Sequence, residues 1–104
     1  MASAVGMIEV YGLVAAFAAC DAGCKAANVT VETFDKNKPS NPEGLDVPLQ
    51  ILVKFRGSVE NVTEAIEAAE VAANKISGVI TKHIIANVEN DTEGMLRLNA
   101  FDKK

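Results

Sequence analysis

The chain has no tryptophan, and aromatic residues make up only 5% of its 104 residues. Hydrophobic residues nevertheless amount to 49%, so the core has to be built from Val, Ile, Leu and Ala, a composition that favours layers of helix on sheet. The length suits one domain and is too short for two that fold separately. The composition therefore predicts a single layered α/β domain.

Basic residues are also scarce. Ten Lys and Arg face 14 Asp and Glu, which gives a formal net charge of −4. Binding to a phosphate backbone needs clustered cations, so we expect no nucleic-acid partner. No apolar run approaches the roughly 20 residues that span a bilayer. Glu9 interrupts the N-terminal apolar stretch, and no basic segment precedes it, so we expect neither export nor a membrane and predict a cytosolic protein.

Catalytic and phosphate-binding motifs are missing. The sequence contains neither a Walker loop nor a G-x-G-x-x-G run. His83, the only histidine, lies among isoleucines without a nearby nucleophile, which is typical of a sheet or interface residue. Glu60, Glu64 and Glu67 are expected on the exposed part of a helix, which favours a solvated face over paired catalytic carboxylates. We predict no enzymatic activity and no cofactor.

The only two cysteines, Cys20 and Cys24, are four residues apart. This spacing can bring two thiolates to one metal ion, but zinc and iron–sulfur sites normally need four ligands, and only His83 remains as an obvious third. We therefore expect the cysteines to pack as small apolar groups and predict no metal. A site shared between chains stays open as an alternative.

Hydrophobic spacing predicts the secondary structure. The expected strands are residues 5–11, 29–34, 49–56 and 79–88, and the expected helices are residues 13–27 and 59–76, the second capped by Ser58. A short helix is expected after Asn90 or Asp91. The order βαββαβ predicts an α/β (α+β) domain with a ferredoxin-like, four-stranded antiparallel sheet and both helices on one face.

The same spacing predicts which helix residues are buried. For the first helix the expected buried stripe is Leu13, Phe17, Cys20, Cys24 and Ala27. For the second it is Val59, Val62, Ile66, Ala69, Ala73 and Ile76.

Residues 35–48 contain all three prolines and are predicted to form a long loop. Such a loop in a small domain is typical of a functional segment, and a solvated hairpin tip is equally consistent with its composition.

Several short stretches together resemble one family. They are GMIE at Gly6–Glu9, Gly12 with Leu13, Asp21 with Ala22, KAANV at Lys25–Val29, Arg56 with Gly57, and HII at His83–Ile85. Over residues 4–88 the chain resembles the single-domain hexameric shell proteins of bacterial microcompartments, with residues 89–104 as a C-terminal extension.

The resemblance implies a structural protein that forms cyclic homohexamers with a pore on the axis. Such hexamers tile with other shell proteins into facets around encapsulated enzymes, so the expected location is the microcompartment shell in the cytoplasm. The alternative is a ferredoxin-like oligomer that binds a small effector or a metal through the long loop or the two cysteines.

The resemblance also implies roles for particular residues. Lys25 and Asn28 correspond to hexamer-edge contacts, whereas the sequence pattern alone predicts a solvated lysine paired with Asp21. The segment between the second and third strands corresponds to the pore. Its candidate lining residues are Lys36, Asn37, Lys38, Ser40, Asn41, Glu43 and Asp46.

The chain departs from the family pattern in two places. Residues 37–48 replace a short glycine-rich pore turn with a longer proline-rich loop. A ring of lysines there would favour anions, and a ring of Glu43 or Asp46 would disfavour them. Residues 86–88 (ANV) stand where Pro-Arg-Pro is common, so an arginine that aids edge contacts is missing, and we expect altered tiling.

Overall fold

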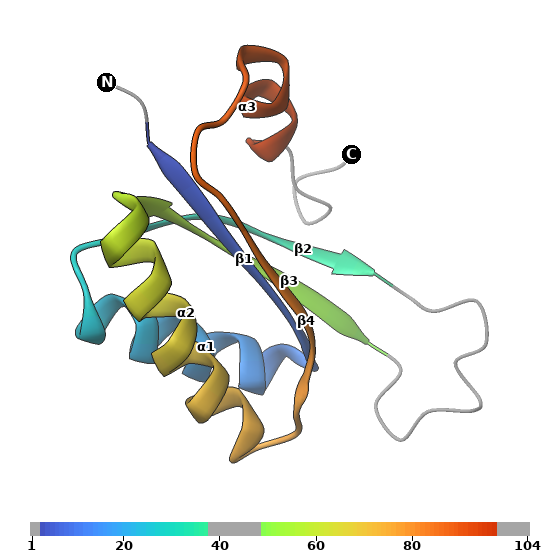
Figure 1. Ribbon diagram of the computed structural model, residues 1–104. Helices are drawn as coiled ribbons and strands as arrows, with labels where there is room; N and C mark the ends of the chain where they lie inside the picture. Colours follow the sequence, from blue (N-terminus) through green and yellow to red (C-terminus); the bar gives the residue numbers. More distant parts are fainter. Residues whose placement is uncertain (1–2, 38–48, 98–104) are drawn as a thin grey trace.

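The computed structural model describes residues 3–37 and 49–97. Within them the chain forms a sheet, two long helices and one short helix (Figure 1). The elements are β1 (Ala4–Tyr11), α1 (Leu13–Ala26), β2 (Thr30–Asn37), β3 (Gln50–Gly57), α2 (Val59–Asn74), β4 (Val79–Ile85) and α3 (Asn90–Leu96). The predicted order, including the short C-terminal helix, is confirmed.

The four strands form one sheet in the order β2-β3-β1-β4, and every neighbouring pair is antiparallel. Helices α1 and α2 lie side by side on one face, with α1 toward the β2 side and α2 toward β4 (Figure 1). The predicted ferredoxin-like arrangement is confirmed. Helix α3 stands near the opposite face, where the side chain of Lys54 in β3 reaches it.

Local sequence features fix the ends of the two long helices. Gly12 adopts a φ of 87° between β1 and α1, a conformation that only glycine takes readily. The hydroxyl of Ser58 accepts a hydrogen bond of 3.1 Å from the backbone N–H of Asn61, which confirms the predicted cap of α2. The backbone N–H of Gly78, with a φ of 130°, donates to the carbonyl of Ala73 at 3.1 Å and closes the other end of α2.

The core lies between the helices and the sheet. Its fully buried members on the strands are Ile8, Val10, Ile51, Val53 and Phe55, and α2 adds Val62, Ala65, Ile66, Ala69 and Ala73. The helices approach the sheet closely, because a methyl group on Gly6 of β1 would collide with the side chains of Val62 and Ile66.

The predicted buried stripe of α1 is wrong for Leu13, Phe17 and Cys24, whereas Cys20 and Ala27 are partly buried against the core. Leu13, Phe17 and Cys24 are exposed, Cys20 is half-buried, and the buried residues of the helix are Ala15, Ala16, Ala19 and Gly23. The reason is space: a Cβ added to Gly23 would lie 2.6 Å from Cζ of Phe55, so only the smallest side chains fit against the sheet. The stripe of large apolar residues points outward instead.

Several predicted boundaries also need correction. In α2, Val62, Ile66, Ala69 and Ala73 are buried as expected, but Val59 at its start is exposed. Helix α2 ends at Asn74, and Ile76 beyond that end is also exposed. Strand β2 runs to Asn37, so residues 35–37 are not loop, and β4 ends at Ile85. The cap residue of α3 is Glu89 and makes no side-chain cap bond. The rest of the predicted loop lies outside the described residues.

Candidate assembly surfaces

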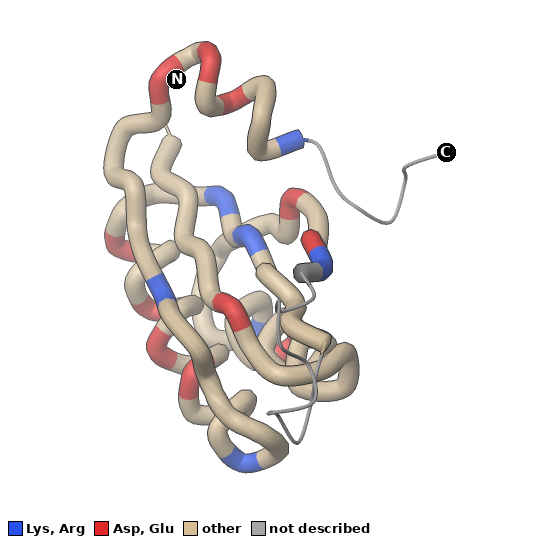
Figure 2. Tube along the Cα trace, turned by 90° about the vertical axis from the view of Figure 1, so that its right-hand side faces the viewer, with Lys and Arg blue, Asp and Glu red and all other residues tan. Residues whose placement is uncertain are grey.

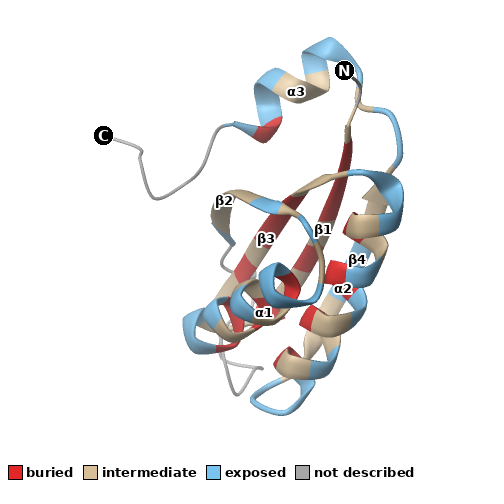
Figure 3. Cartoon of the chain, turned by 90° about the vertical axis from the view of Figure 1, so that its left-hand side faces the viewer, coloured by how far each residue is buried: buried red, intermediate tan, exposed pale blue. Residues whose placement is uncertain are grey.

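The outward surface of α1 carries large apolar side chains. Leu13, Val14 and Phe17 are 39%, 72% and 60% exposed. Figure 3 shows that α1 has both exposed and buried positions. The ring of Phe17 meets that of Phe34 in β2 edge to face, with centroids 5.2 Å apart. We name Leu13, Val14 and Phe17 the outer α1 face; Phe34 beside it is partly buried against the core. A contiguous apolar surface on a small domain is typical of a protein–protein contact.

The end of α1 carries the residues that the resemblance assigns to the hexamer edge. Lys25 donates to the carboxylate of Asp21 at 2.8 Å, and both side chains are largely exposed. This hydrogen bond and the charge of Asp21 raise the pKa of Lys25. Asn28 follows the end of the helix and is exposed. Both residues are accessible to a neighbouring subunit, and their role at a tile edge stays a prediction.

The predicted pore segment is described only at its start. Lys36 and Asn37 are in the last part of β2, where their backbones pair with Ile51 and Gln50 of β3, and the Lys36 side chain is exposed. The remaining candidates lie outside the described residues: Lys38, Ser40, Asn41, Glu43 and Asp46.

The two cysteines share a surface of α1. Burial raises the pKa of Cys20 to about 11, with smaller contributions from Cys24 and Asp21, so its thiol stays protonated near neutral pH. Cys24 is exposed, so its predicted burial is wrong. In the described part of the chain, no group of three or more His, Cys, Asp and Glu side chains is arranged to hold a metal ion.

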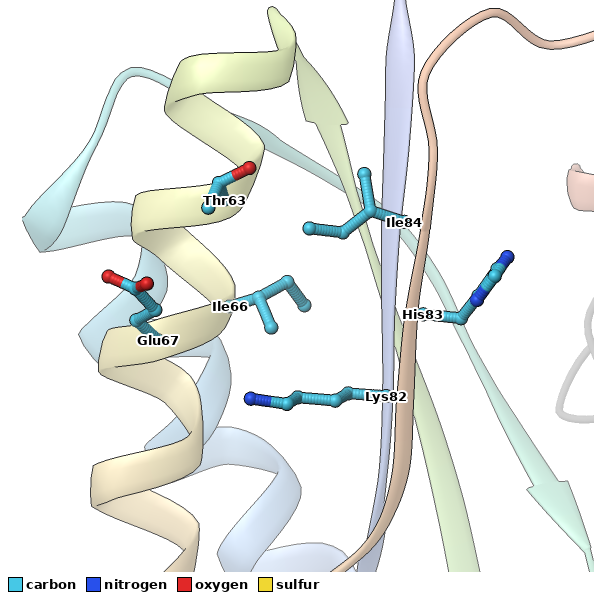
Figure 4. Close-up of a pocket in the computed structure, with 6 residues that line it drawn as sticks. All are labelled: Thr63, Ile66, Glu67, Lys82, His83 and Ile84. Atoms are coloured by element: carbon cyan, nitrogen blue, oxygen red, sulfur yellow. The ribbon is translucent and has the colours of Figure 1, made fainter.

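A pocket that the sequence did not predict lies between α2 and the edge strand β4. Its volume is about 300 Å³, and it is lined by Thr63, Ile66, Glu67, Lys82, His83 and Ile84. Lys82 and Ile84 point toward α2, whereas His83 points away from it (Figure 4). The Lys82 ammonium donates to the carboxylate of Glu70 at 2.7 Å. Because the pocket combines two elements, no single stretch of sequence signals it.

Two basic residues of β3 lie on the face of the sheet that α1 and α2 leave uncovered. Lys54 is only 1% exposed, and its ammonium donates to the carboxylate of Asp35 at 2.9 Å and to the carbonyl of Leu96 at 2.8 Å. Arg56 donates at 2.6 Å to the carboxylate of Glu93. The sequence did not predict this cluster, because a lysine in an apolar strand is not expected to be buried. The one signal is the i, i+2 spacing, which places both residues on the same face.

Acidic residues, in contrast, gather along α2 and α3 (Figure 2). Helix α2 carries Glu60, Glu64, Glu67 and Glu70 and no basic residue. Within residues 3–37 and 49–97, no helix combines the length and the apolar composition that crossing a bilayer would need.

The fold and these surfaces define a small α+β domain that leaves several large apolar side chains exposed. Comparison with known families identifies the class: the BMC domain model matches residues 4–88. The chain therefore belongs to the BMC domain family, the shell proteins of bacterial microcompartments.

Individual relatives agree with this assignment. The chain is 34% identical to the carboxysome shell protein CcmK3 of Halothece sp., over 99% of this chain and 94% of the relative. It is 36% identical to the bacterial microcompartment shell protein PduA of Salmonella typhimurium, over 89% of each. Both relatives are structural shell proteins rather than enzymes, which agrees with the prediction that the chain has no enzymatic activity.

A crystal structure of a microcompartment protein from Desulfitobacterium hafniense has the same fold. It superposes with a TM-score of 0.71 at 22% identity and covers 93% of this chain. The chain spans about half (48%) of that protein's length.

Proposed function

We propose that the chain is a facet subunit of a bacterial microcompartment shell in the bacterial cytoplasm. In this proposal six copies form a ring with an axial pore, and the rings tile with other shell proteins around enclosed enzymes. The similarity to shell proteins from two kinds of microcompartment, over nearly the full length of both partners, carries the proposal.

The structure supports a ring of identical subunits. A cyclic assembly needs two different, complementary surfaces on each subunit, placed so that each copy contacts the next one head to tail. The outer α1 face lies on the β2 side of the domain, and the pocket between α2 and β4 lies on the other side. Burying Leu13, Val14 and Phe17 in such a contact would remove apolar area from water and so favour association.

The edge role of Lys25 makes a separate contribution to the proposal. In the described part of the chain Lys25 pairs with Asp21 on the same helix, and an exposed pair of this kind is easily exchanged for another. The aliphatic part of a lysine can pack against a neighbouring subunit while its ammonium finds carbonyl oxygens. Asn28, which follows the end of α1, would lie beside that contact.

Two measurements test these proposals. Light scattering and native mass spectrometry at micromolar concentration should give the mass of six chains, and a stable monomer or trimer would refute the ring. Electron microscopy should show sheets or tubes for the natural chain and none for Lys25→Glu, while the ring mass is kept. Lys75→Glu makes the same charge change at an exposed site near the end of α2 and serves as the control. Equal assembly of the two variants would show that Lys25 makes no edge contact.

A further inference from the structure

Helix α3 is attached to the sheet by long polar side chains rather than by a packed apolar face. Leu96 is its only buried residue and lies outside the main core, Met95 is 67% exposed, and the space around Gly94 is open. A helix of seven residues is well below the roughly 12–15 residues that an isolated helix needs in water. The position of α3 therefore depends on its few contacts with the sheet.

Two of those contacts join side chains of β3 to α3. Lys54 donates to the backbone carbonyl of Leu96 at 2.8 Å, and Arg56 donates to the carboxylate of Glu93 at 2.6 Å. Glu93 and Leu96 are one helical turn apart, so the carboxylate and the carbonyl lie on the same side of α3. The two cations thus bind an acidic side chain and the negative end of a helix dipole.

One nitrogen of the Arg56 guanidinium takes no part in these contacts. Within the described chain, Nη1 of Arg56 is buried and has no hydrogen-bond partner, while Nη2 donates both to Glu93 and to the hydroxyl of Ser3 at 2.6 Å. A buried donor without an acceptor is unfavourable, and a guanidinium binds a carboxylate most strongly through two parallel hydrogen bonds. A differently placed carboxylate would therefore satisfy Arg56 better than Glu93 does.

We propose that Lys54 and Arg56 form a binding site for the acidic end of a polypeptide helix and that α3 is its detachable intramolecular ligand. The partner is a segment of another polypeptide that carries a carboxylate one turn before its last free carbonyl groups. Binding displaces α3, pairs the new carboxylate with both terminal nitrogens of Arg56, and transfers the Lys54 hydrogen bond from Leu96 to the partner. The proposal requires neither the ring nor the pore.

The first experiment measures how α3 is held in the full chain. Hydrogen exchange of residues 89–97 is compared for the natural chain, Glu93→Gln and Asp91→Asn. Asp91 is an exposed acid on the same helix, so its variant is a matched control for the loss of one charge. We expect exchange to accelerate about tenfold or more in Glu93→Gln, as expected for losing a hydrogen bond between charged groups, and little in Asp91→Asn. Equal exchange in the two variants would overturn the proposal.

The second experiment tests the site itself. A fluorescent peptide with the sequence of residues 89–97 is added to the full-length Glu93→Gln and Asp91→Asn chains, and binding is followed by anisotropy. We expect at least tenfold tighter binding to the Glu93→Gln chain, whose own α3 competes less, and loss of that binding when the peptide carries glutamine at position 93. A loosened α3 without peptide binding at millimolar concentration, or binding that ignores the peptide carboxylate, would refute a binding site. The particle mass, measured in parallel, keeps the result separate from that of the ring.

Discussion

Replacing Gly6 with alanine tests how closely α2 lies on the sheet. Gly6 is in the central strand β1, with its missing side chain directed at α2. An added Cβ would collide with Cγ1 of Val62 and would lie 2.8 Å from Cγ1 of Ile66. Both neighbours are β-branched and stiff at χ1, and both are buried, so they cannot turn away into solvent. The collision has to be relieved by moving α2 away from β1.

The expected cost follows from the packing. Inserting a methyl group into a well-packed core costs about 1–3 kcal/mol, and two stiff neighbours place this site near the upper end of that range. With a urea m-value near 1 kcal/mol per molar, as is usual for a small domain, the midpoint should fall by about 2–3 M. Circular dichroism at fixed protein concentration measures it.

A matched variant shows whether the loss comes from crowding. Gly94→Ala also adds one methyl group, but nothing lies within 4 Å of its Cβ position, and alanine favours a helix over glycine by about 1 kcal/mol. Gly94→Ala should therefore leave the midpoint unchanged or raise it slightly. If the midpoint of Gly6→Ala falls by less than about 0.5 M, α2 does not lie as close to β1 as described.

Two further predictions concern titration and the pore. The pKa of Cys20 rises from an ordinary value of 9.0 to about 11 in the fold, so the stability from its protonated thiol is present below about pH 9 and is lost as the pH rises toward 11. The urea midpoint should therefore decline over this pH range, and Cys20→Ala should make the decline smaller. An identical decline in the variant would contradict the shift. Lys36→Glu, repeated around a ring, should raise the apparent KM of an enclosed enzyme for an anionic substrate and not for a neutral one; equal effects on both would argue against a pore position.

The order of elements could be predicted because its signals are local. Gly12 and Ser58 mark where helices begin, and the mostly apolar run in residues 49–56 indicates a strand whichever strands it pairs with. The observed ends of strands differ from the predicted ones where backbone pairing with a neighbouring strand sets them. Strand β2 reaches Asn37 because Asn37 pairs with Gln50 of β3, a contact that the composition of the segment does not reveal.

The buried face of α1 could not be predicted, because hydrophobic spacing ignores size. Leu13 and Phe17 have the spacing of a core stripe, yet the distance between helix and sheet admits only alanine and glycine. Lys54 was missed for a related reason: its burial depends on Asp35 and on the carbonyl of Leu96, which are remote in sequence. For Lys25, the structure and the residue pattern agree on a pair with Asp21, and only the resemblance suggests a partner at a hexamer edge.

The two faces of α1 have separate roles. Its inner positions, Ala15, Ala16, Ala19 and Gly23, are buried against the rest of the domain, and at Gly23 even one added methyl group would meet the ring of Phe55. Its outer positions Leu13, Val14 and Phe17 are exposed, so they can vary with less effect on the interior. A duplicated gene could therefore keep the same fold and acquire new neighbours through a few outward substitutions. Substitutions on one helix face could thus change which neighbouring subunits a chain contacts in a mixed assembly.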